Sequence, residues 1–437
     1  MLKSLPRTVG VLQPHAGAPD AGARPLRIAF LSYRSDPRVG GQGVYLRQAA
    51  QALARRGHQV DILSGPPYPD TPEGVRLIEI PSLDLYNQPH NGHRALRPRH
   101  LLSWTDTAEY FGHWAGMFME PWSFGRRAAK YLRAHRGEYD VVLDNQSLSS
   151  GLLAIERAGL PVVGVVHHPI RRDLELALAD AKTKGMCWLI TQWYSFLKMQ
   201  EKVAPRLAEV ISVSDAAARD IAACLAVRPE AMTVIHLGID QTLYGPQPDI
   251  RRRDNRILTT ASADVPLKGL KYLIEAYAVL LEHYPRLELV VIGKPREGPT
   301  LEMLDDLKLL DRVIFVSDLT NEEVAEHYAR ATVCVTPSLY EGFGLPAAEA
   351  MSCGAPVVVT DGGALPEIVG DAGVVVPKAD SGALARAIAA LLENPARRAQ
   401  LGAAARQRAR KAFSWDAAAE AYEAVLRRAI ARKRGVA

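Results

Sequence analysis

The sequence predicts an α/β protein made of two doubly wound, Rossmann-like domains that face a deep cleft. Its 437 residues suffice for two or three domains, each with its own core. Short β-branched or apolar runs alternate with helical stretches, a pattern typical of parallel sheets covered by helices. The pattern stops at the polar stretch 246–256 and then starts again. Because such folds bind ligands at the carboxyl ends of their strands, we expect the functional site between the two domains.

Each half of the chain supplies one set of strands. In the first half, strands are expected at 26–32, 59–64, 139–145, 160–168 and 210–214, and a helix at 44–56. In the second half, strands are expected at 256–262, 287–293, 312–317, 331–338 and 356–361. The expected organisation is a flexible tail (1–25), an N-terminal acceptor domain (26–245), a hinge (246–256), a C-terminal donor domain (257–413) and a helix that packs back on the N-terminal domain (414–437).

Composition excludes several classes of protein. A content of 48% hydrophobic and 23% charged residues indicates a folded globular protein, neither disordered nor fibrous. The net charge is +5, which suits an anionic membrane surface or a phosphate-bearing ligand, with a solvated surface of mixed charge as the alternative. No apolar run is long enough to span a bilayer. Four cysteines without a CxxC pair predict a reducing, cytoplasmic location.

The most informative segment reads EGFGLPAAEA and places Glu341 and Glu349 around a glycine-broken turn that begins a helix. Gly342 and Gly344 allow the backbone to approach a ligand closely. The helix starting at Leu345 offers free amide groups and a positive dipole end, both of which favour phosphate. The segment therefore predicts a site for a sugar and a ribose. The alternative is a helix cap with an ordinary surface glutamate.

A second glycine-rich turn follows the first strand. Gly40, Gly41 and Gly43 lead directly into a helix, so their backbone amides can form an anion site against a diphosphate. A dinucleotide-binding turn would need a third glycine where this sequence has Leu46. Such a turn also needs an acidic residue at the end of the second strand, whereas the acidic residue there, Asp61, lies inside the strand. An NAD site is therefore not expected.

Two further polar residues are candidates. His167, followed by His168 at the end of a strand, can hydrogen-bond a sugar hydroxyl while charge develops at the anomeric carbon; the alternative is a strand cap or a buried histidine with a partner. Adjacent strand residues point to opposite faces and no third ligand is suggested, so no zinc site is predicted. Lys268, before Gly269 at a helix start, can reach a leaving diphosphate as a point charge, whereas the helix dipole disfavours a merely solvated lysine there.

With these motifs the sequence resembles a retaining glycosyltransferase of family 4, which has the two-domain architecture called GT-B. The resemblance runs from about Leu26 to the final helix, and the spaced glutamate pair, followed by GAPVVVTDGGALPEIV, is its most specific element. It implies that Glu341 contacts the donor sugar and Glu349 the nucleotide ribose. It also implies that His167 lies near the reacting sugar and that Lys268 binds phosphate. The diphosphate would be supported by the amides of Phe343, Gly344 and Leu345 and by the loop of Gly40 and Gly41.

The implied reaction moves a sugar from a nucleotide-diphosphate donor to an acceptor hydroxyl with retention at the anomeric carbon. The departing phosphate would accept the acceptor's proton on the same face. A cationic lysine and amide dipoles would replace a metal, consistent with the absence of a D-x-D motif, so no metal or other cofactor is expected. The expected partners are a nucleotide sugar and an unknown acceptor that could be a glycan, a lipid or a small molecule, and no nucleic acid is expected.

The sequence departs from the family pattern at one position. Family members usually carry an arginine five or six residues before the phosphate-binding lysine, whereas this chain has Ser262 and Ala263 there and no arginine between Arg256 and Lys268. Arg296 is a candidate substitute. Two alternatives to a transferase stay open: a nucleotide-sugar epimerase, which shares the architecture, and a catalytically degenerate subunit, which the missing arginine suggests.

Two aromatic segments stand out in the first half. The segment 182–207 carries tryptophans between lysines, which is typical of an interfacial membrane helix or a lipid-acceptor lid. The alternative is a helix that covers the acceptor side of the domain. The segment 84–124 is expected to form an irregular insertion near the acceptor opening. Peripheral contact with the inner face of a membrane is therefore a further prediction.

Overall fold

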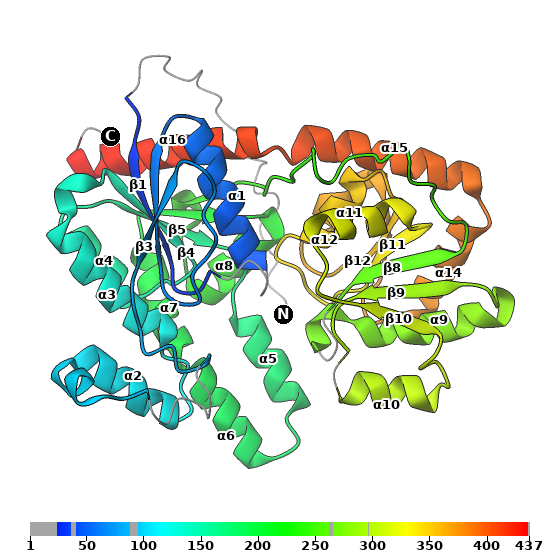
Figure 1. Cartoon of the computed structure of the whole chain (residues 1–437), viewed down its shortest axis with the longest axis horizontal. Helices are drawn as coiled ribbons and strands as arrows, with labels where there is room; N and C mark the ends of the chain where they lie inside the picture. Colours follow the sequence, from blue (N-terminus) through cyan, green and yellow to red (C-terminus); the bar gives the residue numbers. More distant parts are fainter. Residues whose placement is uncertain (1–23, 36–40, 88–94, 262–264, 296, 436–437) are drawn as a thin grey trace, which may run out of the picture.

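The computed structural model describes residues 24–35, 41–87, 95–261, 265–295 and 297–435, and these form two parallel sheets with helices packed around them (Figure 1). The N-terminal sheet has the order β3-β2-β1-β4-β5-β6-β7, and every strand pair in it is parallel. Its strands are β1 (Arg27–Ser32), β2 (Gln59–Ser64), β3 (Val75–Glu79), β4 (Val141–Asn145), β5 (Val162–Val166), β6 (Glu209–Ser212) and β7 (Met232–Val234). The edge strands β3 and β7 were not expected from the sequence.

The C-terminal sheet has the order β10-β9-β8-β11-β12-β13 and is also parallel. Its strands are β8 (Arg256–Thr260), β9 (Glu288–Ile292), β10 (Val313–Val316), β11 (Val333–Thr336), β12 (Val357–Thr360) and β13 (Val374–Val376). The edge strand β13 is the one that sequence reasoning missed here. The predicted α/β fold with two Rossmann-like domains is confirmed.

Helices cover the sheets (Figure 1). The N-terminal half contains α1 (Gly41–Arg55), α2 (Trp104–Trp114), α3 (Glu120–Ala134), α4 (Ser150–Arg157), α5 (Arg171–Asp180), α6 (Lys184–Trp193), α7 (Leu197–Val203) and α8 (Asp215–Leu225). The C-terminal half contains α9 (Leu270–His283), α10 (Pro299–Asp306), α11 (Asn321–Arg330), α12 (Leu345–Ser352), α13 (Leu365–Val369), α14 (Ser381–Leu392), α15 (Pro395–Ala412) and α16 (Trp415–Arg434). None of the described helices combines the length and the apolar character needed to cross a membrane.

The central strands are apolar because helices bury both of their faces. Every residue of β4 and β5 is buried, and both strands are rich in valine. This is the composition expected of a parallel sheet covered on two sides. The core therefore holds the carboxyl ends of these strands in a constant position, and the loop after β5 carries the candidate His167.

The last helix, α16, runs along the N-terminal domain (Figure 1). The hydroxyl groups of Tyr422 and Tyr45 lie 2.8 Å apart, and the indole of Trp415 donates to the side-chain oxygen of Gln48 at 3.0 Å. Arg56 on α1 forms an ion pair with Glu423. These contacts join the end of the chain to α1, which begins at the predicted glycine-rich turn.

Two expectations for the first half were wrong in detail. The segment 84–124 is not irregular, since it contains the 3₁₀ helix η2 (Pro98–Leu102), α2 and the start of α3. The segment 182–207 is not one helix, because α6 and α7 are separated by the 3₁₀ turn η4 (Tyr194–Phe196). The predicted tail up to residue 23 lies outside the described residues, as do Gly40, Ser262, Ala263 and Arg296.

Candidate active site

The candidate residues lie where the strand order of each sheet reverses. In the N-terminal sheet the reversal falls between β1 and β4, and in the C-terminal sheet between β8 and β11. Such switch points leave a crevice beyond the carboxyl ends of the flanking strands. Gly41 follows β1, Lys268 follows β8 and Glu341 follows β11. The fold therefore puts residues far apart in sequence at matching edges of the two sheets.

The turn before α12 has the glycine-dependent shape that the sequence predicts. Gly344 has a φ of 101°, which favours glycine, and α12 begins at the next residue, Leu345. The carbonyl oxygen of Glu341 accepts a hydrogen bond from the amide of Ala364 at 2.9 Å. Phe343 is buried beneath the turn. The free amides at the start of α12 are therefore held in one orientation, which suits an anionic ligand.

Lys268 and Glu341 form an ion pair at the edge of the C-terminal sheet. The Lys268 ammonium group donates to Glu341 Oε1 at 2.8 Å, and Ser338 Oγ donates to the same oxygen at 2.8 Å. The lysine ends the 3₁₀ turn η7 (Pro266–Lys268). Gly269 follows with a φ of 62°, and a methyl group on it would lie 2.1 Å from the carbonyl oxygen of Pro337. Close backbone packing therefore fixes the lysine beside the loop that carries Glu341.

Glu349 lies one turn inside α12 and is hydrogen-bonded to a buried tyrosine. Tyr328 Oη donates to Glu349 Oε2 at 3.1 Å, and it also lies 3.1 Å from the hydroxyl of Thr260 at the end of β8. Burial raises the pKa of Glu349 to about 7, although the hydrogen bond from Tyr328 acts in the opposite direction. The carboxyl group is thus poised to change its protonation state near neutral pH.

His167 follows β5 and is held in one tautomer by Asn145. The amide nitrogen of Asn145 donates to the backbone carbonyl of Gln42, so its Oδ1 faces His167 Nε2 at 2.8 Å. Nε2 must then carry the proton, and Nδ1 has a free lone pair. The main-chain amide of His167 donates to Gln146 Oε1 at 2.6 Å. Burial, and to a lesser extent the charge of His168, lowers the pKa of His167 to about 3, so the ring is neutral.

The two halves of the site touch across the gap between the domains. A methyl group on Gly342 would lie 2.3 Å from the carbonyl oxygen of His167, and one on Gly41 would lie 3.5 Å from Leu345 Cδ1. Ser214 Oγ, at the start of α8, donates to the carbonyl oxygen of Gly342 at 2.6 Å. The structure thus brings together His167 and Gly41 from one domain with Gly342 and Leu345 from the other.

Comparisons with known proteins address the family. The model described as Glycosyltransferase Family 4 matches residues 39–243, and the model described as Glycosyl transferases group 1 matches residues 247–408. The MMP alpha-(1->4)-mannosyltransferase of Mycolicibacterium hassiacum is 44% identical over 415 residues, which cover 93% of this chain and 99% of that protein. The chain is a family 4 glycosyltransferase.

Other comparisons agree with this assignment. A D-inositol 3-phosphate glycosyltransferase of Xylanimonas cellulosilytica is 31% identical over 94% of this chain and 99% of its own length. The solved sucrose-phosphate synthase of Thermosynechococcus elongatus superimposes with a TM-score of 0.68 at 23% identity, covering 93% of this chain and 100% of that one. HepE of Anabaena, solved with UDP and glucose, has a TM-score of 0.66 at 20% identity over 92% of this chain and 99% of that one. These two structures support the GT-B fold.

Sequence reasoning missed a residue of this glycosyltransferase that links its domains. Glu367 on α13 accepts hydrogen bonds from the amides of Asp215 and Ala216 at the start of α8, and its Oε1 lies 2.7 Å from His236 Nε2. Burial alone would raise the pKa of Glu367, but the hydrogen bonds from His236 and the two amides lower it. Glu367 stands in the quoted LPEIV segment, but its position gave no signal that the carboxylate caps a helix of the other domain.

Asn145, Tyr328 and Ser338 were missed as well. Each orients a predicted residue, and Asn145 and Ser338 stood at a recognisable place, the last position of an expected strand. Among the described residues, no group of three or more His, Cys, Asp and Glu side chains is arranged to hold a metal ion.

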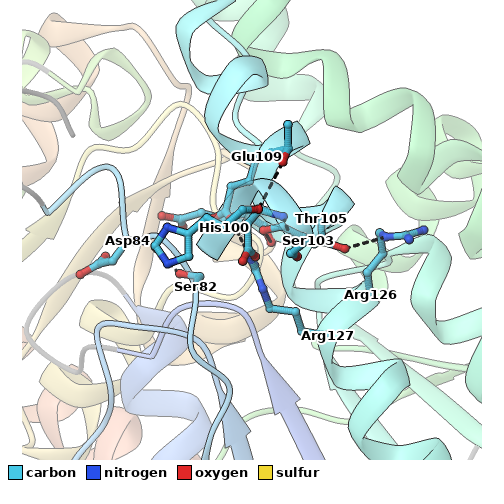
Figure 2. Close-up of polar contacts among 12 residues, drawn as sticks. Ser82, Asp84, His100, Ser103, Thr105, Glu109, Arg126 and Arg127 are labelled. Carbon is cyan, nitrogen blue, oxygen red and sulfur yellow. Dashed lines mark hydrogen bonds and ion pairs between the residues drawn. The ribbon is translucent and has the colours of Figure 1, made fainter. Parts of the chain in front are cut away.

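The glycosyltransferase also has a pocket of about 660 Å³ away from the predicted residues, between η2, α2, α3 and the segment after β3. Figure 2 shows polar residues in and around its wall, among them His100, Arg126 and Arg127. Arg127 is paired with both Asp106 and Glu109. Arg126 donates to Thr105 at 3.1 Å in the same wall. None of the predicted donor-binding residues lines this pocket. It is therefore separate from the candidate active site.

Proposed function

We propose that the protein is a retaining, metal-independent glycosyltransferase that moves a sugar from a nucleotide-diphosphate donor to an acceptor hydroxyl. The observation that carries the proposal is the Lys268–Glu341 pair at 2.8 Å, beside the start of α12. Across the domain gap, Gly342 of this loop packs on the backbone of His167. A cation and an amide-rich helix start thus lie close to the segment that carries the neutral His167, which supports the proposal.

Each residue has a role in this proposal. Lys268 and the amides of Phe343, Gly344 and Leu345 stabilise the diphosphate as its charge develops. Glu341 binds donor-sugar hydroxyls, and Glu349 binds the nucleotide ribose. His167 donates through Nε2 to Asn145, so its free Nδ1 lone pair is left to accept a hydrogen bond from a sugar hydroxyl.

The reaction is proposed to occur on one face of the sugar. The bond from the anomeric carbon to the phosphate oxygen breaks, and a bond from that carbon to the acceptor oxygen forms. The acceptor's proton passes to the departing phosphate oxygen, which balances the charge. A double displacement would need a carboxylate nucleophile at the anomeric carbon. Glu341 Oε1 is already engaged by Lys268 and Ser338, which favours a binding role for this residue.

The donor is proposed to carry mannose, and the linkage formed is proposed to be α-(1→4). The support is the 44% identity to an enzyme named MMP alpha-(1->4)-mannosyltransferase, over 99% of that enzyme. HepE has been solved with UDP-glucose, which supports a nucleotide sugar as the donor class. A cytoplasmic location is also proposed, because Cys187, Cys224, Cys334 and Cys353 are all free thiols.

The test is turnover of purified protein with GDP-mannose and UDP-glucose, with and without an α-(1→4)-linked mannose oligosaccharide. The expected result is a lengthened oligosaccharide by mass spectrometry, with an α-anomeric proton by NMR, in buffer with chelator. Lys268→Ala and Glu341→Ala should abolish transfer, whereas Lys411→Ala, an exposed lysine on α15, should not. An altered nucleotide sugar formed without acceptor would indicate the epimerase, and no turnover of any donor would indicate a degenerate subunit.

A further inference from the structure

Exposed apolar side chains gather on one end of the N-terminal domain. Nine of the fifteen large apolar side chains that are exposed in the described part of the chain lie on η2, α2 and α6. They are Leu101, Leu102, Trp104, Phe111, Trp114, Met186, Trp188, Leu189 and Trp193, called here the aromatic face. Figure 1 shows α2 and α6 at the end of this domain opposite α16. Exposed apolar patches of this kind mark interaction surfaces.

The two helices form one packed unit beneath the aromatic face. The rings of Phe118 and Trp193 are stacked with centroids 5.1 Å apart, and Tyr86 lies 5.4 Å from Trp193 and 4.7 Å from His113. Inner aromatic contacts therefore fix α2 against α6. The side chains on the outer side of these helices are exposed despite this packing: Leu102 is 91% exposed, Trp104 69% and Trp188 57%. The exposed side chains therefore lie on helices that are themselves well packed, which indicates that another surface covers them.

The rim of the aromatic face is cationic. Lys182, Lys184 and Lys198 at the α6 side, and Arg97 and Arg99 at the η2 side, are exposed and form no ion pair within the described residues. The helix α6 contains no acidic residue. On α2, Asp106 and Glu109 are both paired with Arg127, and Glu109 is buried. An apolar surface with an unpaired cationic rim complements an anionic bilayer.

From these observations we propose that the aromatic face docks the protein on an anionic membrane surface, with Leu102, Trp104 and Trp188 entering the lipid interface. The proposal stands independently of the proposed transfer reaction. Aliphatic side chains such as Leu102 and Met186 offer no hydrogen bonds to a saccharide, which favours lipid over an acceptor glycan. A symmetric pairing of two copies through this face would bring the same cationic rims together, which opposes self-association.

The test uses the full-length protein and two kinds of vesicle, pure phosphatidylcholine and phosphatidylcholine mixed with phosphatidylglycerol. Co-sedimentation should show binding to the mixed vesicles that is at least about tenfold tighter than to the neutral ones and weakens with salt. Four of the six tryptophans lie on the aromatic face, so their fluorescence should shift to shorter wavelength on binding. Binding of the wild type to neither vesicle would overturn the proposal.

Two sets of substitutions test the apolar and the ionic contributions to membrane binding separately. The triple change Leu102→Ser, Trp104→Ser and Trp188→Ser should weaken binding to mixed vesicles by at least about tenfold. The double change Lys182→Glu and Lys184→Glu should remove most of the salt-sensitive contribution to vesicle binding. The matched control, Val279→Ser with Leu310→Ser, changes apolar residues exposed on the other domain (52% and 46%) and should bind like the wild type.

Two readouts keep the alternatives apart. The triple variant should retain its melting temperature and its transfer to a soluble acceptor. The proposal is overturned if the triple variant binds vesicles as the wild type does. If the wild type also forms dimers and the triple variant loses only this self-association, the aromatic face serves as an interface between copies of the chain and the proposal is likewise overturned. Loss of transfer to a soluble acceptor with vesicle binding intact would also overturn it, since the face would then serve the acceptor.

Discussion

The ammonium nitrogen of Lys268 lies 2.8 Å from a carboxylate oxygen of Glu341, although the residues are 73 positions apart in the chain. Ser338 holds the same oxygen, and backbone contacts between Leu267 and Leu339 join the two loops at 2.8 Å. The charges are thus positioned before any ligand arrives. Such preorganisation lowers the cost of stabilising charge in a transition state.

Replacing Lys268 by methionine should lower kcat by about 10²- to 10³-fold, because the developing charge on the diphosphate loses its cation. Steady-state kinetics with the turned-over donor measure the effect. Lys268→Arg should keep part of the activity, since it keeps the charge but not the geometry. Equal activity of wild type and Lys268→Met would remove the lysine from the proposed mechanism.

Glu349 should make the folded state less stable as pH rises. Its pKa is about 7 in the fold against an ordinary value of 4.5, so between these values the unfolded chain ionises while the folded carboxyl stays protonated. The free energy of unfolding should therefore fall by roughly 3 kcal/mol between pH 4.5 and pH 8 through this group. When Glu349→Gln is unfolded with urea at both pH values, its free energy of unfolding should not show this fall. An identical pH dependence in the variant would contradict the raised pKa.

His167 should remain neutral throughout the working pH range. Its pKa of about 3 lies below the ordinary 6.5, so its contribution to stability is complete above pH 6.5 and is lost as pH falls toward 3. Nitrogen-15 NMR should show an Nε2–H tautomer without titration between pH 5 and 9. Asn145→Leu should lower kcat, and Asn145→Asp should restore part of it by keeping the acceptor oxygen. A His167 titration near pH 6.5 would count against the buried geometry.

Gly342→Ala should separate the domains. The added methyl group would lie 2.3 Å from the carbonyl oxygen of His167, and a backbone atom cannot rotate away. A displacement of about 1 Å at a reacting site can cost about 100-fold in rate. We expect that loss in kcat and a larger radius of gyration by small-angle scattering. Gly137→Ala, where nothing lies within 4 Å, is the matched control and should behave as wild type.

Glu367→Gln should loosen the same domain contact more gently. Glutamine can keep one hydrogen bond to the start of α8 but loses the charge that pairs with His236 and favours the helix end. The KM for the donor should rise by a larger factor than kcat falls, because part of the donor's binding energy would then be used to bring the two domains together. A variant with unchanged kinetics and an unchanged scattering profile would show that Glu367 has no part in closure.

The sequence by itself was enough for the α/β class, the family and the local shape of the ligand turn. Its central strands are buried on both faces, which forces apolar runs that are easy to recognise, and Gly344 adopts a conformation that favours glycine. The edge strands β3, β7 and β13 escaped recognition because β7 and β13 are only three residues long and β3 has charged residues at two of its five positions. The helices of residues 98–114 escaped for a different reason: several of their large apolar side chains are exposed, so the sequence lacks the usual core-facing apolar stripe.

Tertiary structure alone decided which residues meet. The pairing of Lys268 with Glu341, the hold of Asn145 on His167 and the cap that Glu367 places on α8 each join loops far apart in the chain. The protonation of Glu349 and His167 was decided in the same way, because a pKa depends on burial and neighbours that a linear sequence does not contain. Local propensity follows from neighbouring residues, whereas charge, tautomer and domain contact depend on how the sheets bring distant loops together.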